Sequence, residues 1–86
     1  MVRTIIGKST FESKDKTKRY YKVVVLEPTT AKQRGNGRYG FSAVDYFIDK
    51  GLFQDITDDF ENFPQADLEY YIVNGRAELT SIQMVK

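Results

Sequence analysis

Four consecutive aliphatic residues, Val23 to Leu26, restrict the fold more than any other feature of the sequence. A continuous apolar run of β-branched residues is typical of a strand that is covered on both faces. We therefore predict a core strand over residues 19–27, and Pro28 ends it. The preceding residues 13–18 are polar and rich in lysine, so they predict an exposed turn.

Four other segments have the β-branched or alternating pattern of strands, and they are residues 2–11, 39–49, 66–74 and 76–85. Gly7 predicts a bulge or a sharp bend within the first of them. Asn74-Gly75 predicts a tight hairpin turn between the last two. The apolar positions of the last segment change phase between Leu79 and Ile82, which predicts a bulge near residues 80 and 81.

A short helix is expected between the third and fourth strands. Over residues 52–63, three apolar side chains recur at the spacing of one helical face, namely Ile56, Phe60 and Phe63. Thr57 or Asp55 is the expected cap. Pro64 stops the helix, which we interpret as a plug of one or two turns that closes the bottom of a barrel.

Five strands with a helical turn between the third and fourth follow the element order of the OB-fold barrel. An SH3-like barrel is the main alternative, but it would have fewer residues between the second and third strands. We expect an all-β fold, a five-stranded OB-fold-like barrel, in which residues 1–86 form one domain. Alternation in the third strand assigns Val44, Tyr46 and Ile48 to the core.

The chain has no cysteine and no histidine. This excludes disulfides, the usual zinc sites and every catalytic pair that contains either residue. A carboxylate-rich region could hold Mg²⁺, and it comprises Asp45, Asp49, Asp55, Asp58, Asp59 and Glu61. The last three of these residues are most simply interpreted as the polar face of the short helix. We expect no enzyme, no cofactor, no metal and no small-molecule substrate.

The sequence also bears on localisation. No apolar stretch approaches the roughly 20 residues of a membrane span, and Met1-Val2-Arg3 is not the start of a signal peptide. The lack of cysteine fits a reducing cytoplasm. We expect a cytoplasmic protein with no membrane partner.

Charge is divided unevenly along the chain, although the net charge is only +1. Residues 1–38 contain ten Lys or Arg against three carboxylates, which is a formal charge of +7. Residues 39–86 contain three Lys or Arg against nine carboxylates, which is −6. A basic face suits a polyanion. The alternatives are that the two halves attract each other in a dimer or only solvate the surface.

Cations and aromatic residues occur together in two basic segments, the turn at residues 13–18 and a polar, glycine-punctuated loop predicted over residues 29–40. The candidate phosphate ligands are Lys14, Lys16, Lys18, Lys22, Lys32, Arg34 and Arg38, and the candidate stacking residues are Tyr20 or Tyr21, Tyr39 and Phe41. Strand alternation lets only one of the adjacent tyrosines face a ligand, and we prefer Tyr21. We expect both segments to contribute to one face. The alternative is that neither segment binds a ligand: the turn is a solvated hairpin tip, the loop is an ordinary loop, and the aromatic residues belong to the core.

In layout the chain resembles the single-stranded DNA-binding proteins of filamentous phages, the gene V type, and more loosely other small OB-fold proteins of phages and plasmids. The resemblance rests on the size, on Lys18-Arg19-Tyr20-Tyr21 after a basic hairpin, on the segment from Phe63-Pro64 to Tyr70, and on residues 75–82. It implies a homodimer that coats single strands cooperatively in phage or plasmid replication, in the host cytoplasm. The positions that match the family's contacts are Lys16, Lys18, Arg19, Tyr20 and Tyr21. The family's later hairpin carries an aromatic residue, whereas the turn here offers Arg76.

These observations predict a sequence-tolerant single-stranded DNA-binding protein. RNA remains an open alternative, because the same surface would stack on either polymer. A duplex is a poorer ligand, because no recognition helix is expected. The main alternative function is a small β-barrel interaction module that docks an acidic protein partner through its basic loops.

Overall fold

The computed structural model describes residues 1–85, except the side chains of residues 76 and 77, and consists mainly of β-strands. The strands are β1 (Val2–Glu12), β2 (Arg19–Pro28), β3 (Phe41–Ile48), β4 (Gln65–Val73) and β5 (Arg76–Met84), and the helices are α1 (Ala31–Gly35) and α2 (Lys50–Asp55). All strand pairs are antiparallel, in the order β3-β2-β1-β4-β5. The prediction of five strands with a short helix between the third and the fourth is confirmed.

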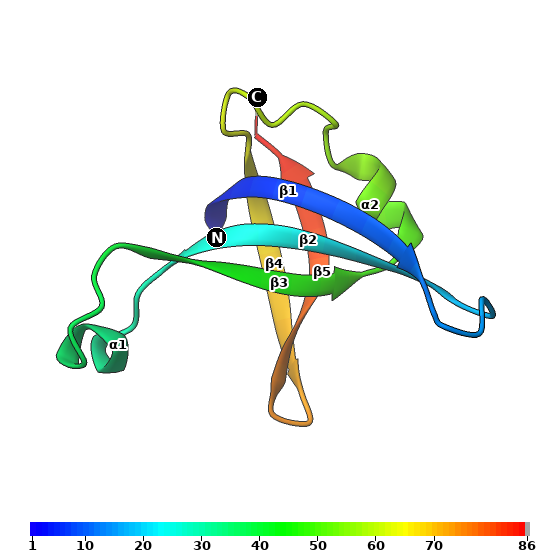
Figure 1. Cartoon of the computed structure of the whole chain (residues 1–86). Coiled ribbons are helices and arrows are strands. Elements are labelled where there is room, and N and C mark those ends of the chain that lie inside the picture. Colours follow the sequence, from blue (N-terminus) through cyan, green and yellow to red (C-terminus); the bar gives the residue numbers. More distant parts are fainter. Residues whose placement is uncertain (86) are drawn as a thin grey trace.

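Strand β1 belongs to both layers of the structure. Its first residues, Val2 to Thr4, pair with β4, and from Ile5 onward it pairs with β2. The register shifts between Ile5 and Gly7, which confirms the predicted bulge at Gly7. Bulges of this kind let a strand bend from one layer into another. As a result β1, β2 and β3 form one layer, and β4 and β5 run across behind it (Figure 1).

The core lies between these two layers. It consists of eight buried apolar residues, which are Ile5, Val23, Val25, Ile56, Ala66, Leu68, Leu79 and Ile82. Tyr46 and Ile48 of β3 pack against it, as alternation predicted. The prediction that the run from Val23 to Leu26 is covered on both faces is wrong, because Val24 and Leu26 point away from the second layer and are only half-buried.

The sheet is not closed into a barrel. Strands β3 and β5 form its two edges, and some of their Cα atoms lie within 8 Å of each other. Within residues 1–85, no strand pairing joins these two edges. The coarser prediction of a mainly β, five-stranded antiparallel fold holds, while the closed OB-fold-like barrel stays a proposal.

Helix α2 begins at Lys50, before the predicted start at residue 52. It ends at Asp55, one of the two residues predicted to cap the start of the helix. The Asp49 carboxylate accepts a hydrogen bond from the backbone N–H of Leu52 at 2.8 Å, so Asp49 is the cap rather than Thr57 or Asp55. At the other end, Lys8 Nζ donates to the carbonyl oxygens of Phe53 and Ile56 at 3.1 and 2.8 Å. These bonds attach the end of the helix to β1, and the Phe53 carbonyl oxygen also accepts from the Ile56 N–H at 3.4 Å.

The three apolar residues expected on one helical face therefore lie outside the helix. Ile56 directly follows α2 and is buried, and Phe60 packs against the core. Phe63 is 69% exposed. The spacing of i, i+4 and i+7 correctly assigned Ile56 and Phe60 to the core region. It was wrong for the secondary structure, because α2 ends at Asp55 and the backbone is extended at Ile56, with φ −82° and ψ 139°.

Helix α1 lies in the segment that we predicted as a loop. Thr30 and Gln33 form a capping box, in which the Thr30 hydroxyl accepts from the Gln33 N–H and the Gln33 side chain accepts from the Thr30 N–H. A threonine followed three residues later by glutamine is a known helix-start pattern. Positive φ angles at Gly37 and Gly40, 87° and 99°, return the chain to β3.

The β4–β5 hairpin matches its predicted turn. Asn74 and Gly75 both have positive φ, 50° and 77°, as a two-residue turn of type I′ requires. The register shift opposite Glu69 and Tyr70 leaves Thr80 as the additional residue of β5, which confirms the predicted bulge. The Arg76 side chain, which the sequence singled out at this turn, lies outside the described residues.

In the part of the chain that the structure describes, there is no helix long and apolar enough to cross a membrane.

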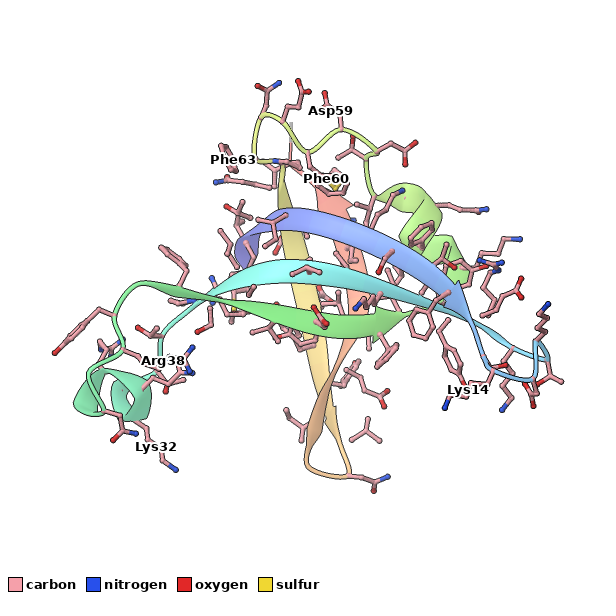
Figure 2. All side chains as sticks on the ribbon, viewed as in Figure 1. Lys14, Lys32, Arg38, Asp59, Phe60 and Phe63 are labelled. Carbon is pink, nitrogen blue, oxygen red and sulfur yellow. The ribbon has the colours of Figure 1, made fainter. Side chains whose placement is uncertain are left out.

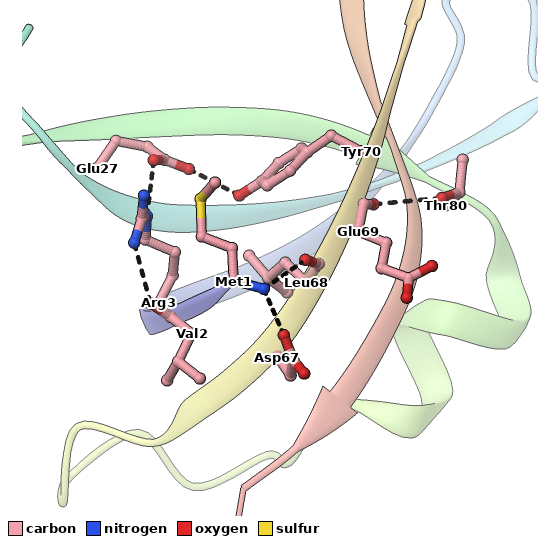
Figure 3. Close-up of polar contacts among 9 residues, drawn as sticks. All are labelled: Met1, Val2, Arg3, Glu27, Asp67, Leu68, Glu69, Tyr70 and Thr80. Atoms are coloured by element: carbon pink, nitrogen blue, oxygen red, sulfur yellow. Dashed lines mark hydrogen bonds and ion pairs between the residues drawn. The ribbon is translucent and has the colours of Figure 1, made fainter.

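A polar network joins the two layers beside the core (Figure 3). Glu27 of β2 accepts hydrogen bonds from Arg3 Nε at 2.9 Å, from the Tyr70 hydroxyl at 2.7 Å and from the Tyr46 hydroxyl at 3.2 Å. Burial opposes the ionised carboxylate, but hydrogen bonds from Tyr70, Arg3 and Tyr46 outweigh it and lower the pKa of Glu27. Burial and the nearby Glu27 carboxylate raise the pKa of both tyrosines.

This network predicts a pH-dependent contribution to stability. Because the folded pKa of Glu27 lies below its ordinary value of 4.5, the carboxylate stabilises the fold above that pH, and the contribution is lost as the pH falls through the folded pKa. We expect Glu27→Gln to lower the free energy of unfolding by about 1–3 kcal/mol at pH 7, and this loss to become smaller as the pH falls through the folded pKa. Urea unfolding at pH 7, 5 and 3 measures the difference, with Glu61→Gln as an exposed control. An equal loss at all three pH values would contradict the assignment.

Candidate nucleic-acid interface

We call the surface of β1, β2 and β3 that faces away from β4 and β5 the outer face. It carries most of the exposed aromatic residues that lie near the basic segments. Val23 and Val25 point to the core, so alternate residues of β2 and their partners on β1 and β3 point outward. The outward-facing residues are Gly7, Ser9, Phe11, Tyr20, Lys22, Val24, Leu26, Phe41, Ala43, Asp45 and Phe47.

Three aromatic rings meet at one end of the outer face. Phe11 and Tyr20 are stacked with ring centroids 5.5 Å apart. Phe47 of β3 meets the edges of both, at 6.4 and 6.2 Å. The three side chains are 42%, 39% and 60% exposed. A cluster of rings that keeps this much surface in water offers faces on which bases can stack.

The hairpin register explains how these rings come together. The turn at residues 13–18 pairs Glu12 with Arg19, which places Phe11 opposite Tyr20. The pairing of Lys22 with Phe47 then brings the third ring beside them. Sequence reasoning did not include Phe11 or Phe47 in the site. Alternation across three strands could have found them, because both have the outward phase of Tyr20.

Tyr21, which we preferred as the ligand-facing tyrosine, points to the other side of the sheet. It is half-buried and its ring packs on Phe53 of α2 at 5.0 Å. The outward position belongs to Tyr20. Arg19 also lies on the Tyr21 side, where its guanidinium pairs with Glu12 Oε1 at 2.6 Å and contacts the Thr10 hydroxyl at 3.2 Å.

The lysine-rich turn is held in one shape by Asp15. Its Oδ1 atom accepts hydrogen bonds from the Ser13 hydroxyl at 2.6 Å, the Thr17 hydroxyl at 2.7 Å and the Thr17 N–H at 3.1 Å. These bonds lower the pKa of Asp15 to about 2. The exposed lysines of the turn form no ion pair within residues 1–85, and we call them the hairpin cations: Lys14, Lys16 and Lys18.

The second basic segment is organised around α1. Arg34 donates to the carbonyl oxygen of buried Thr29, so its guanidinium holds the segment together. Lys32 and Arg38 are exposed and make no ion pair in the described part of the chain, and we call this pair the helix-loop cations. Tyr39 and Phe41 follow them and are 77% and 68% exposed.

The two basic segments do not form one patch. The turn at residues 13–18 and the α1 segment lie at opposite ends of the β1–β2–β3 layer (Figures 1 and 2). They are joined to opposite ends of β2, which has 10 residues and so spans roughly 30 Å. They are therefore two separate patches, and both border the outer face, which lies between them.

The middle of the outer face is nearly neutral. Lys22 Nζ lies 3.3 Å from the Asp45 carboxylate, and both side chains point outward. Their neighbours Val24, Leu26 and Ala43 are apolar. Lys22 was predicted as a free phosphate ligand, but in this structure it is partly neutralised by Asp45.

Four of the six carboxylates that could have held Mg²⁺ have separate structural roles. Asp49 caps α2, and Asp45 pairs with Lys22. Asp58 pairs with Lys8 Nζ at 2.8 Å, and Asp59 accepts from the Glu61 N–H at 3.0 Å. Residues 58–61 follow α2 instead of forming its polar face, so that prediction is wrong. Among the residues that the structure describes, no group of three or more potential ligands is placed to hold a metal ion.

Comparisons of the chain with models of protein families, with curated proteins and with solved structures found no match.

Proposed function

We propose that this protein binds single-stranded DNA along the outer face, without strong sequence preference. The observation that carries the proposal is the exposed cluster of Phe11, Tyr20 and Phe47 beside the hairpin cations. Every base has a π-face, so stacking on aromatic rings tolerates any sequence. Cations next to such rings hold the phosphates of the same strand.

Stacking and phosphate contacts both contribute to the proposed affinity. Each stacked base contributes about 1–3 kcal/mol, and each phosphate contact steepens the salt dependence of single-strand binding by about 0.7 on a log–log scale. The outer face carries one carboxylate, Asp45, and it is paired with Lys22. Repulsion of a polyanion from this surface is therefore small. Three of the nine carboxylates of residues 39–86 lie elsewhere, on the loop after α2 that includes Asp59 (Figure 2).

The proposal extends to fold and assembly. We propose that the sheet is an OB-type barrel left open between β3 and β5, in which the face of strands 2 and 3 is the common ligand surface. We further propose a homodimer that coats single strands during phage or plasmid replication in the cytoplasm, as the resemblance to the gene V type implies. A small chain without disulfides gains burial by such association.

The test is a salt-varied titration by fluorescence anisotropy, with labelled oligo-dT, a matched duplex and oligo-U as ligands. We expect oligo-dT to bind more tightly than the duplex and its affinity to fall steeply as salt rises from 50 to 500 mM. Binding to oligo-U as tight as to oligo-dT would extend the function to RNA. Equal affinity for duplex and single strand, affinity that does not depend on salt, or no binding would refute the proposal.

Docking of a protein partner is the second candidate, because Phe41, Phe47 and the other exposed apolar side chains of the outer face also suit a protein contact. An acidic partner would match the cations at both ends. Capture of one defined protein from nuclease-treated lysate, lost in a Phe47→Ala variant, together with no binding of single strands, would favour this candidate.

A further inference from the structure

The placement of charge on the outer face carries a second inference, which rests on the proposed function. The hairpin cations and the helix-loop cations lie at the two ends of the face (Figure 2). Between them, the only outward-facing cation of the three strands is Lys22, and it is paired with Asp45. The ends can therefore hold phosphates, while the middle can hold only bases.

We propose that one DNA strand occupies the whole outer face, held by its phosphates at the two ends and by its bases between them. At the hairpin end the bases meet Phe11, Tyr20 and Phe47, and at the other end they meet Phe41 and Tyr39, whose side chains are exposed beside Arg38. The site then requires a minimum length of ligand. A strand that is too short contacts one set of cations only.

The required length follows from the dimensions. Strand β2 spans roughly 30 Å, and the longest dimension of the molecule is 43 Å. A stacked strand advances about 3.4 Å per phosphate, so a 16-mer covers the face even when fully stacked. A 4-mer covers about 10 Å when stacked and, even extended to about twice that spacing, falls short of the second set of cations.

The two sets of cations can be removed separately. Lys32→Gln with Arg38→Gln removes the helix-loop cations, and Lys14→Gln with Lys18→Gln removes two hairpin cations. Glutamine removes the charge, keeps a polar side chain, and has a helix propensity close to that of lysine at position 32 of α1. Arg34 is left in place because it bonds to the Thr29 carbonyl group. Lys50→Gln, at the start of α2, serves as the control for loss of a charge elsewhere.

The experiment measures affinity and salt slope for dT4 and dT16 by anisotropy. We expect the helix-loop variant to weaken dT16 on the order of tenfold at 100 mM salt and to lower its salt slope by about 1.4, for two phosphates, while dT4 at the hairpin end changes less than about twofold. The hairpin variant should weaken both ligands. Unchanged dT16 binding in the helix-loop variant would overturn the inference and leave the proposed function intact. Failure of the unaltered protein to bind either oligomer would overturn both.

Discussion

Replacing Tyr20 and Phe47 together with alanine should weaken oligo-dT binding by at least about 30-fold. The two rings belong to different strands and present separate faces of one exposed cluster. If each stacks on a base, their loss removes about 2–6 kcal/mol of binding free energy. Since both side chains lie at the surface, we expect the double variant to stay folded with a modestly lower melting temperature. Anisotropy titration and a thermal melt measure the two effects separately.

Phe63→Ala is the matched control for this prediction. Phe63 is an exposed aromatic residue, more exposed than the cluster residues, and it lies on the loop between α2 and β4, away from both basic segments (Figure 2). Its removal should leave the affinity unchanged within about twofold. Wild-type affinity in the Tyr20/Phe47 double variant would exclude the outer face as the stacking surface. So would an equal loss of affinity in the Phe63 variant.

Leu68→Ala should destabilise the protein by about 2–5 kcal/mol. Leu68 is 1% exposed and lies among Ile5, Val23, Val25 and Leu79 in the core between the layers. Truncation removes apolar contacts and leaves a cavity that the surrounding strands cannot fill. For a chain of 86 residues, whose total stability is about 4–13 kcal/mol, this is a large fraction. Urea unfolding followed by circular dichroism gives the free energy directly.

Ile72→Ala provides the contrast within the same strand. Ile72 shares the alternation phase of Leu68, but it is 74% exposed because the β4–β5 hairpin extends past the first layer. We expect a change of at most about 0.5 kcal/mol. A loss for Ile72→Ala as large as that for Leu68→Ala would mean that the end of the hairpin is buried in solution, for example in a dimer.

The candidate site was predictable in its residue types and not in its arrangement. Local charge and aromatic content singled out the 13–18 turn, Tyr20, Tyr39 and Phe41, and the structure leaves these three aromatic side chains exposed. Which of Tyr20 and Tyr21 points outward depends on the pairing register with two other strands, since a shift of one residue exchanges the two faces. Phe11 and Phe47 have the outward phase of Tyr20, but only the pairing of the three strands shows that their rings meet.

Local sequence patterns also could not predict the ion pairs between strands. Lys22 and Asp45 are 23 residues apart, and Arg3 and Glu27 are 24 apart. Each pair forms because antiparallel pairing or packing places the two side chains together. A count of cations along the chain therefore overestimates how many are free to bind phosphates.

By itself, the sequence determined the features that depend on neighbouring residues. Asn74-Gly75 specifies its turn because both residues tolerate positive φ. Alternation specifies the five strands, and the phase change before Ile82 specifies the bulge at Thr80. Asp49 and Thr30 also specify the starts of α2 and α1 locally, because each side chain caps the first turn.

Only the tertiary structure decided which residues share a surface. It placed the two basic segments at opposite ends of one layer, left the β3 and β5 edges unpaired, and assigned Tyr21 to the inner side against Phe53. The physical reason is that these features depend on register and on packing between segments distant in sequence. The free energy of burying Val23, Val25 and Leu68 together selects that arrangement, and no local pattern contains it.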